Sequence, residues 1–321
     1  MKKLISPKQV ARAIGVSEST LKRWCDRGLI SMTKTAGGHR RMELDAVVRF
    51  LRDSGHEIVE PELLGLPAAV GQTGWTLNRA CERISSALVA GEESVVRQVV
   101  FDLLLAGHTV TAIFDDVLAP VMHQIGEKWA CGEAAVYQER RACEICMRLL
   151  HELRSTTASI EAASPTAIGG TIEHDIYTIP ATMAEVLLRS IGWMATGIGT
   201  NLPFDTMRKA ISETRPRLCW LSVSFIRDEK AFVAGINNLF LAAHEFGSAL
   251  AIGGQAVSES LRQQIQYTTF CESFRDLEMF ARSLHPHRSQ PTPSSAGKLP
   301  LNQIQQPELE QPTELDADAA D

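Results

Sequence analysis

The fold of the N-terminal region is decided by residues 6–24, which read SPKQVARAIGVSESTLKRW. Ser6 followed by Pro7 is typical of a helix that begins with a capping serine and a proline in its first turn. The apolar positions that follow at helical spacing are Val10, Ala11 and Ile14. This spacing puts all three on one face, so the segment predicts a short amphipathic helix packed against a core.

A glycine-containing turn and a second helix follow. Either Ser17 or Ser19 can cap this helix, which ends before Gly28. Two helices joined in this way form a helix-turn-helix, in which the first half of the second helix meets base edges and phosphates of DNA. The candidate contact residues are Ser19, Thr20, Lys22 and Arg23. Leu21 and Trp24 are predicted to pack inward.

Residues 33–41, which follow the second helix, read TKTAGGHRR. The paired glycines suit the tip of a tight hairpin, and cations flank it on both sides. We interpret this segment as the wing of a winged helix-turn-helix. Its candidate DNA contacts are Lys34, His39, Arg40 and Arg41. For His39, a DNA contact and a structural anchor beneath the wing are both open.

The stretch Gly38-His39-Arg40 resembles the MerR family of regulators, which carries a Gly-His-Arg segment after the wing. The resemblance implies that Arg40 and Arg41 contact DNA phosphates. It also implies a DNA-binding regulator whose remaining domains respond to a signal.

Charge is distributed unevenly along the chain. Residues 1–52 contain twelve Lys or Arg against four Asp or Glu, which gives this segment +8 within a total of −6. The remaining residues therefore carry −14. A cationic segment in an acidic chain places the phosphate-attracting surface at the N-terminus, so we expect double-stranded DNA as the partner. A charged helical domain that binds protein is the alternative.

A linker is predicted for residues 55–74, because glycine and proline interrupt any periodicity there. Residues 75–160 differ, since apolar residues recur at helical spacing. The helical segments lie near residues 76–90, 93–106, 109–130 and 134–154. This pattern predicts a four-helix bundle. Cys143 and Cys146 fall inside the last segment, where core packing is expected rather than a metal or redox site.

One motif in the predicted bundle has a distinctive spacing. Trp129 is followed, after nine residues, by Glu139 and Arg140. This resembles the helical cap of the cobalamin-dependent photoreceptor repressors, MerR-type proteins in which a Trp and a Glu-His pair cover the upper face of adenosylcobalamin. The resemblance implies that Trp129 and Glu139 are cofactor-binding positions, with filling of the bundle core as the alternative for Trp129. Arg140 stands where the family has its cobalt-binding His, and a guanidinium offers no lone pair.

Residues 165–285 alternate short apolar strands with amphipathic helices. The strand candidates are Ala167–Ile172, Trp193–Gly197, Arg217–Val223, Ser248–Ile252 and Tyr267–Phe270. Such alternation predicts a parallel, doubly wound sheet with any ligand at the carboxyl ends of its strands. The fold class is therefore multidomain: a winged helix-turn-helix over residues 1–54, a four-helix bundle, and an α/β doubly wound Rossmann-like domain. By the same resemblance, this last domain is of the cobalamin-binding type.

The family carries Asp-x-His-x-x-Gly at its ligand-binding turn, and this chain has TIEHDIYTIP at residues 171–180. Two alignments compete. Taking His174 as the ligand loses the Asp and lengthens the following helix by three residues. We prefer the alignment that keeps Asp175, which puts Tyr177 at the cobalt-binding His and Pro180 at the Gly. A protonated phenol is a poor cobalt ligand and is expected to fill space instead, and the proline ring hinders approach of the nucleotide tail.

Other positions match the cobalamin-binding domain in part. Ser222 matches the Ser of the family's Ser-x-Leu motif, and Gly253-Gly254 match the paired glycines beside the nucleotide tail. The resemblance therefore implies vestigial cofactor contacts without cobalt–histidine ligation, and no light sensing by the family mechanism. No cofactor is assigned, and cobalamin is the candidate. Haem, another small molecule or a protein partner are alternatives, for which Tyr177, His174 and Cys219 are candidate contacts.

Several features narrow the class of protein. No apolar run reaches the roughly 20 residues of a membrane span. The seven cysteines lack the spacing of a disulfide framework, so we expect a cytoplasmic protein. No catalytic barrel or substrate domain is recognisable, which favours a regulator over an enzyme. Residues 286–321 are rich in Pro, Gln, Glu and Asp and predict a disordered acidic tail.

The expected function is DNA-binding transcriptional regulation of the MerR type. The C-terminal region is expected to control homo-oligomerisation in response to a small-molecule or protein effector. The alternative is a cobalamin-binding, light- or ligand-responsive repressor with a different set of ligands to cobalt.

Overall fold

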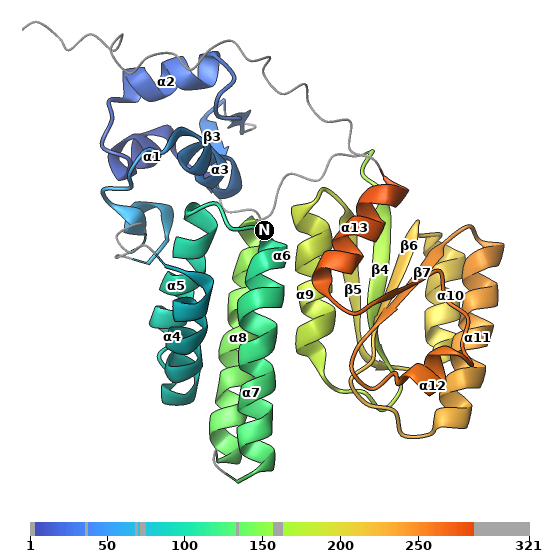
Figure 1. Cartoon of the computed structure of the whole chain (residues 1–321). Coiled ribbons are helices and arrows are strands. Elements are labelled where there is room, and N and C mark those ends of the chain that lie inside the picture. Colours follow the sequence, from blue (N-terminus) through green and yellow to red (C-terminus); the bar gives the residue numbers. More distant parts are fainter. Residues whose placement is uncertain are drawn as a thin grey trace, which may run out of the picture. The chain divides into compact units, whose positions relative to one another are not determined.

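The protein's structure is a computed structural model that describes residues 4–35, 38–67, 70, 75–132, 135–156 and 163–285 (Figure 1). The tail predicted at residues 286–321 and the hairpin tip at residues 36–37 lie outside the described residues. None of the described helices is both long and apolar enough to span a membrane.

The N-terminal helices begin where capping serines stand in the sequence. Ser6 accepts the backbone N–H of Gln9, and the Gln9 side chain accepts the backbone N–H of Ser6, which completes a capping box. Ser17, rather than Ser19, caps the second helix by accepting the N–H of Thr20. The helices of this region are α1 (Pro7–Ala13), α2 (Glu18–Asp26) and α3 (Leu44–Ser54).

A small antiparallel sheet accompanies these helices. Its strands are β1 (Leu4–Ile5), β2 (Thr33–Lys34) and β3 (Arg40–Glu43), in the order β1-β3-β2. Thr33 pairs with Arg41 and Lys34 with Arg40, so β2 and β3 form a hairpin. Gly38 has a φ of 76° within it, a left-handed conformation that glycine adopts without strain.

The core of this N-terminal region lies between the helices. Leu21 of α2 is completely buried, and the Trp24 ring lies 4.9 Å from the rings of both Phe50 and His56. Both residues therefore pack inward, as predicted. The chain then continues along α1 through the 3-10 helix η1 (Pro61–Leu64), whose Leu64 is fully buried. Part of the segment predicted as a linker is thus packed against the helix-turn-helix.

The middle region is helical, and helices form in each of the segments predicted. They are α4 (Leu77–Ala90), α5 (Glu93–Leu105), α6 (Val110–Ile113), the π-helix η2 (Phe114–Leu118), α7 (Ala119–Ala130) and α8 (Val136–Thr156). Helix α4 contacts α5, α7 and α8, and α7 contacts α8. Gly91 ends α4 with a φ of 82°, and Gly107 follows α5 with a φ of 92°.

The C-terminal region holds a five-stranded parallel sheet in the order β5-β4-β6-β7-β8. The strands are β4 (Thr166–Ile172), β5 (Met194–Leu202), β6 (Leu218–Ser222), β7 (Ala249–Gly253) and β8 (Thr269–Cys271). The parallel, doubly wound prediction is confirmed. Strand β5 differs from its predicted bounds, because it begins after Trp193 and continues past two glycines to Leu202.

Helices cover both faces of this sheet (Figure 1). They are α9 (Thr178–Ser190), α10 (Phe204–Thr214), α11 (Glu229–Glu245), α12 (Glu259–Arg262) and α13 (Phe274–Leu284). Buried residues of α9 and α13 pack with Trp220 and Ala251 on one face. Buried residues of α10 and α11 pack with Cys219 and Leu250 on the other. The alternation of strand side chains between the faces follows from the strand period of two.

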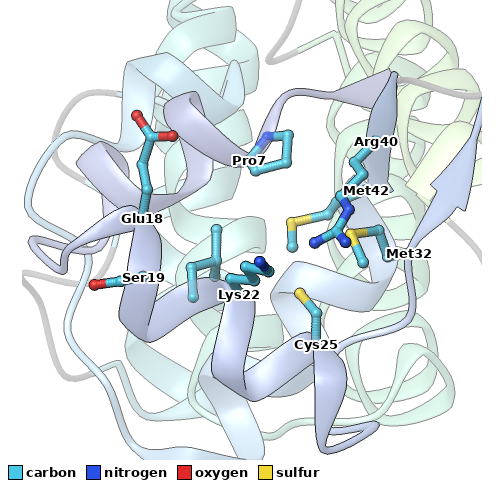
Figure 2. A pocket seen from close by; sticks show the side chains of 9 residues that line it. Pro7, Glu18, Ser19, Lys22, Cys25, Met32, Arg40 and Met42 are labelled. Carbon is cyan, nitrogen blue, oxygen red and sulfur yellow. The ribbon is translucent and has the colours of Figure 1, made fainter. Parts of the chain in front are cut away.

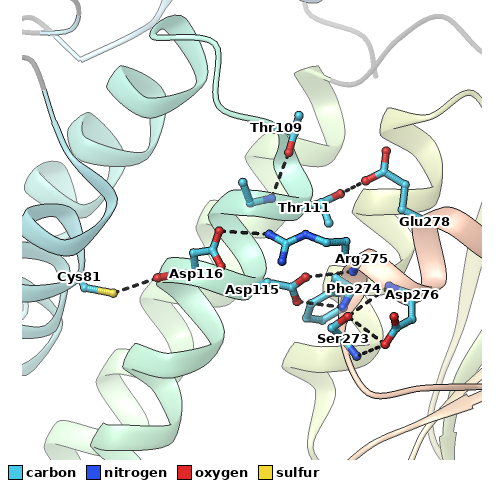
Figure 3. A network of polar contacts seen from close by, with 11 residues as sticks. Cys81, Thr109, Thr111, Asp115, Asp116, Ser273, Phe274, Arg275, Asp276 and Glu278 are labelled. Carbon is cyan, nitrogen blue, oxygen red and sulfur yellow. Dashed lines mark hydrogen bonds and ion pairs between the residues drawn. The ribbon is translucent and has the colours of Figure 1, made fainter.

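The π-helix η2 connects the helical region to α13 (Figure 3). The Asp115 carboxylate accepts the backbone N–H groups of Phe274 and Arg275, each at 2.9 Å. Asp116 pairs with the Arg275 guanidinium at 3.2 Å, and its carbonyl accepts the Cys81 thiol at 3.2 Å. A carboxylate at a helix N-terminus accepts N–H groups that have no partner within the helix, and its negative charge interacts favourably with the positive end of the helix dipole. Asp115 therefore holds α13 against the helical region.

Replacing Asp115 with alanine is expected to lower the free energy of unfolding by about 1–3 kcal/mol, because two N–H donors lose a charged acceptor. Asp116→Ala is the matched control. It removes an ion pair between exposed side chains, which is worth less than about 1 kcal/mol. Urea denaturation followed by circular dichroism compares the two. Equal losses in both variants would contradict the assigned role of Asp115.

Candidate functional site

Hydroxyl groups gather at the first turn of α2. Ser17 Oγ lies 2.8 Å from Ser19 Oγ and 2.9 Å from Thr20 Oγ1. Ser19 is exposed and Thr20 half-buried. The helix N-terminus carries a partial positive charge, so this cluster is chemically suited to a phosphate oxygen.

Between α2 and β3 lies a hollow of about 300 Å³ (Figure 2). Lys22 from α2 and Arg40 from β3 both line it. Its apolar lining includes Cys25, Met32 and Met42, which sequence reasoning did not single out because thioethers and thiols are ordinary core residues. Ser19 and Glu18 of α2 line it as well. The structure thus brings together three predicted DNA contacts, Ser19, Lys22 and Arg40, with one carboxylate in the same lining.

The remaining predicted cations lie on the same two elements. Arg23 is exposed on α2 and Lys34 is exposed on β2. Lys34 pairs in register with Arg40, and the half-buried Arg41 is next to it on β3. Helix α2 and the β2–β3 hairpin therefore carry all of the predicted cationic contacts.

The cations of α2 and the hairpin differ from other cations of the N-terminal region in their ion pairs. Among the described residues, no carboxylate forms an ion pair with the cations of α2 and the hairpin, which are Lys22, Arg23, Lys34, Arg40 and Arg41. Two arginines of α1 and α3 differ. Arg12 pairs with Glu60 at 3.0 Å, and Arg49 pairs with Asp45 at 2.7 Å. Cations that form no ion pair within the described residues remain available to attract a polyanion.

His39 is exposed in the hairpin. Its carbonyl accepts the N–H of Thr35 at 2.9 Å, which belongs to the hairpin ladder. Within the described part of the chain, its imidazole has no hydrogen bond. This favours a DNA contact over an anchor beneath the hairpin.

At the carboxyl edge of the parallel sheet, Asp175 is completely buried. Its Oδ1 accepts the backbone N–H of Tyr177 at 3.0 Å, and its Oδ2 accepts those of Ser224 at 2.6 Å and Phe225 at 3.3 Å. Burial raises the pKa of the Asp175 carboxyl, and these hydrogen bonds oppose the rise. Asp175 therefore ties the turn after β4 to the turn after β6.

Tyr177 is placed differently from its predicted position. We expected the side chain to fill space, but it is 51% exposed at the N-terminus of α9. Asp175 contacts its backbone N–H rather than its hydroxyl. The Asp175 carboxylate accepts three backbone N–H groups, so it orients the backbone of this turn.

A second set of hydrogen bonds closes the same edge. His174 and Asn201 have left-handed φ values of 68° and 54°. The His174 N–H donates to Asn201 Oδ1 at 2.7 Å, and the Asn201 N–H lies 3.0 Å from both Thr171 Oγ1 and the Asp175 carbonyl. His174 thus acts through its backbone as a turn residue. Asn201 was missed from the sequence, where only its tolerance of the left-handed region could have marked it.

The other predicted contacts lie at this edge too. Ser222 ends β6 and is buried, and Gly253 ends β7. Gly254 has a φ of 120°, and a Cβ there would lie 2.1 Å from the Val223 carbonyl oxygen. This glycine is required by the packing of the chain against itself.

In the helical region, Trp129 is 43% exposed near the end of α7, so it does not fill the core. Glu139 lies on α8, where its carboxylate accepts the Cys143 thiol at 3.3 Å and contacts Arg140 at 3.4 Å. No hydrogen bond or ring contact between Trp129 and Glu139 occurs among the described residues.

The cysteines behave as packing groups. Burial raises the pKa of Cys219 and of Cys146 to about 12. A thiol with so high a pKa is a poor ligand and nucleophile, so Cys219 is not suited to an effector contact. Within the described residues, no group of three or more His, Cys, Asp or Glu is arranged to hold a metal ion.

Comparison with known families identifies two parts of the chain. A helix-turn-helix domain model matches residues 4–54, and a B12 binding domain model matches residues 80–154. The second match covers the helical region. The helix-turn-helix prediction is therefore confirmed.

Two curated repressors are similar to the chain over most of its length. The chain is 27% identical to the HTH-type transcriptional repressor CarH of Myxococcus xanthus, over 78% of this chain and 91% of that protein. It is 24% identical to the HTH-type transcriptional repressor CarA of the same organism, over 79% of this chain and 87% of that protein. The resemblance to this class of repressor, predicted from sequence motifs, is confirmed.

Among solved structures, the monomethylamine corrinoid protein of Methanosarcina barkeri has a similar fold. Its TM-score is 0.54 at 16% identity, over 65% of this chain and all of that chain. At this identity the likeness establishes only a similar fold over that share of the chain.

Proposed function

We propose that this chain is a transcriptional regulator that binds double-stranded DNA through a winged helix-turn-helix, with α2 in the major groove and the β2–β3 hairpin as the wing. The observation that carries the proposal is the set of cations on these two elements that have no acidic partner among the described residues. The matches to a helix-turn-helix domain and to two repressors support the same assignment.

We propose that base edges are contacted by side chains of α2, namely Ser19, Thr20, Lys22 and Arg23. We propose that DNA phosphates are contacted by side chains of the hairpin, namely Lys34, His39, Arg40 and Arg41. The hollow between Lys22 and Arg40 is where a backbone phosphate meets both elements at once.

The helical and α/β regions are proposed to form a four-helix bundle and a Rossmann-like domain that set the oligomeric state. A homo-oligomer bound at two half-sites gains affinity over a single subunit, so an effector that favours one assembly alters operator occupancy. The signal is a small molecule or a protein partner, and the site of action is cytoplasmic.

A corrinoid-responsive repressor is the second candidate, because a B12 binding domain model matches residues 80–154. The sheet edge does not fit cobalt ligation of the usual kind. Both Asp175 oxygens are held by backbone donors, and Tyr177 presents a phenol where an imidazole is expected. We therefore propose regulation without cobalt–histidine ligation, and Trp129, Glu139 and Ser222 as vestigial contacts.

Electrophoretic mobility shifts with promoter fragments of the source genome test the proposal. At moderate salt the full chain is expected to select one or a few fragments over competitor DNA. A uniform affinity for all fragments would refute sequence-specific regulation.

A further inference from the structure

A single tryptophan fills the space between the sheet and the first turn of α9. Trp220 lies in the middle of β6 and is 2% exposed. Its indole N–H donates to the Ala181 carbonyl of α9 at 3.3 Å. A Cβ placed on Gly169 of the neighbouring β4 would lie 2.1 Å from the indole ring, so the ring rests directly on the β4 backbone.

The positions around Trp220 are those through which the resemblance implies a nucleotide tail. Trp220 and Ser222 are two residues apart on β6 and therefore share a face of the sheet. Pro180 immediately precedes Ala181, the hydrogen-bond acceptor of the indole. The indole thus fills the space between β4, β6 and the first turn of α9, on the face of the sheet that Ser222 shares and beside Pro180.

We infer that Trp220 determines ligand specificity by excluding the nucleotide tail of a corrinoid from the α/β domain. The inference rests on the proposed cobalamin-type ancestry of the domain. It deepens that proposal, because it names the part of the ligand that gains no contact: the tail, as distinct from the macrocycle.

The test compares two probes that share a corrin ring, namely hydroxocobalamin, which has the nucleotide tail, and diaquocobinamide, which lacks it. Binding to the full chain is measured in the dark by equilibrium dialysis with absorption readout. Dissociation constants that agree within about threefold support the inference, since the tail then adds no affinity. An absence of binding for both probes overturns it, since the domain then does not distinguish the tail from the macrocycle. Hydroxocobalamin binding at least about tenfold tighter than diaquocobinamide overturns it.

Substitution of the indole provides the second arm. Trp220→Ala opens the space, and the preference for hydroxocobalamin over diaquocobinamide is expected to rise at least about tenfold. Trp193→Ala is the matched control, because it removes another fully buried indole, immediately before β5, and should leave the preference unchanged. If Trp220→Ala does not fold by circular dichroism, Trp220→Leu replaces it. An unchanged preference in the folded variant overturns the role of Trp220.

Mobility shifts with the same preparations keep this test separate from the proposed function. Specific DNA binding by the wild-type chain upholds the regulator whatever the corrinoid result, and its loss would refute the regulator while leaving the dialysis result to decide on Trp220.

Discussion

Replacing both Lys22 and Arg40 with alanine is expected to lower the affinity of the full chain for its DNA site at least about tenfold, and to reduce the salt slope of binding by about two. The reason is that the two side chains line one hollow from different elements and have no acidic partner among the described residues. Each cation that neutralises a phosphate releases counterions, so its loss weakens binding and flattens the salt dependence together. Fluorescence anisotropy titrations at several salt concentrations measure both quantities.

Lys230→Ala is the control for the loss of a cation elsewhere on the chain. Lys230 is an exposed lysine on α11, in the α/β region. Its removal lowers the net charge of the chain without touching α2 or the hairpin, so affinity and slope should hardly change. An equal loss in the control would show that overall charge, and not this face, governs DNA binding.

Replacing Asp175 with alanine is expected to lower the free energy of unfolding by about 3 kcal/mol or more, the largest stability effect that we predict. Three backbone N–H donors lose their acceptor, and two of them belong to a turn almost fifty residues away in the sequence. Ser222→Ala is the control, because Ser222 is the last residue of β6 at the same edge of the sheet and its side chain makes no hydrogen bond to Asp175 among the described residues. Urea denaturation followed by circular dichroism distinguishes the two, and losses of similar size would contradict the account of Asp175.

The protonation of Asp175 adds a pH signature to this prediction. Burial raises the carboxyl pKa of the folded state above the ordinary value of 3.8. The folded state then binds the proton more tightly than the unfolded state, so the stability contribution of Asp175 is greatest below about pH 4 and falls as pH rises through the folded-state pKa. Relative to Asp175→Asn, the wild-type chain should gain stability on acidification. A difference that stays constant or shrinks would contradict the raised pKa.

Short-range sequence signals were sufficient to predict the helices and the hairpin of the N-terminal region. The caps at Ser6 and Ser17, the inward side chains of α2 and the positive-φ glycine of the hairpin all depend on neighbours within a few residues. From the sequence, either Ser17 or Ser19 could cap the second helix, and in the structure Ser17 does so. The parallel strands were also recognisable, since apolar runs alternate with helical patterns.

Contacts between residues far apart in the chain could not be predicted from the sequence pattern. Asp175 was singled out as a cofactor contact, but its partners Ser224 and Phe225 are distant in sequence, so its structural role could not be read. The same holds for Asp115, which meets α13 more than 150 residues later. Strand β5 was predicted to end at Gly197, but parallel pairing with β4 carries it to Leu202.

The most direct test of the central claim is the affinity of the full chain for a selected promoter fragment compared with a scrambled duplex of the same composition. At about 0.15 M salt, the account predicts at least about a hundredfold preference for the promoter fragment, with a salt slope for both duplexes that falls in the Lys22→Ala, Arg40→Ala variant. Equal affinities for the two duplexes, unaffected by the double substitution, would contradict it.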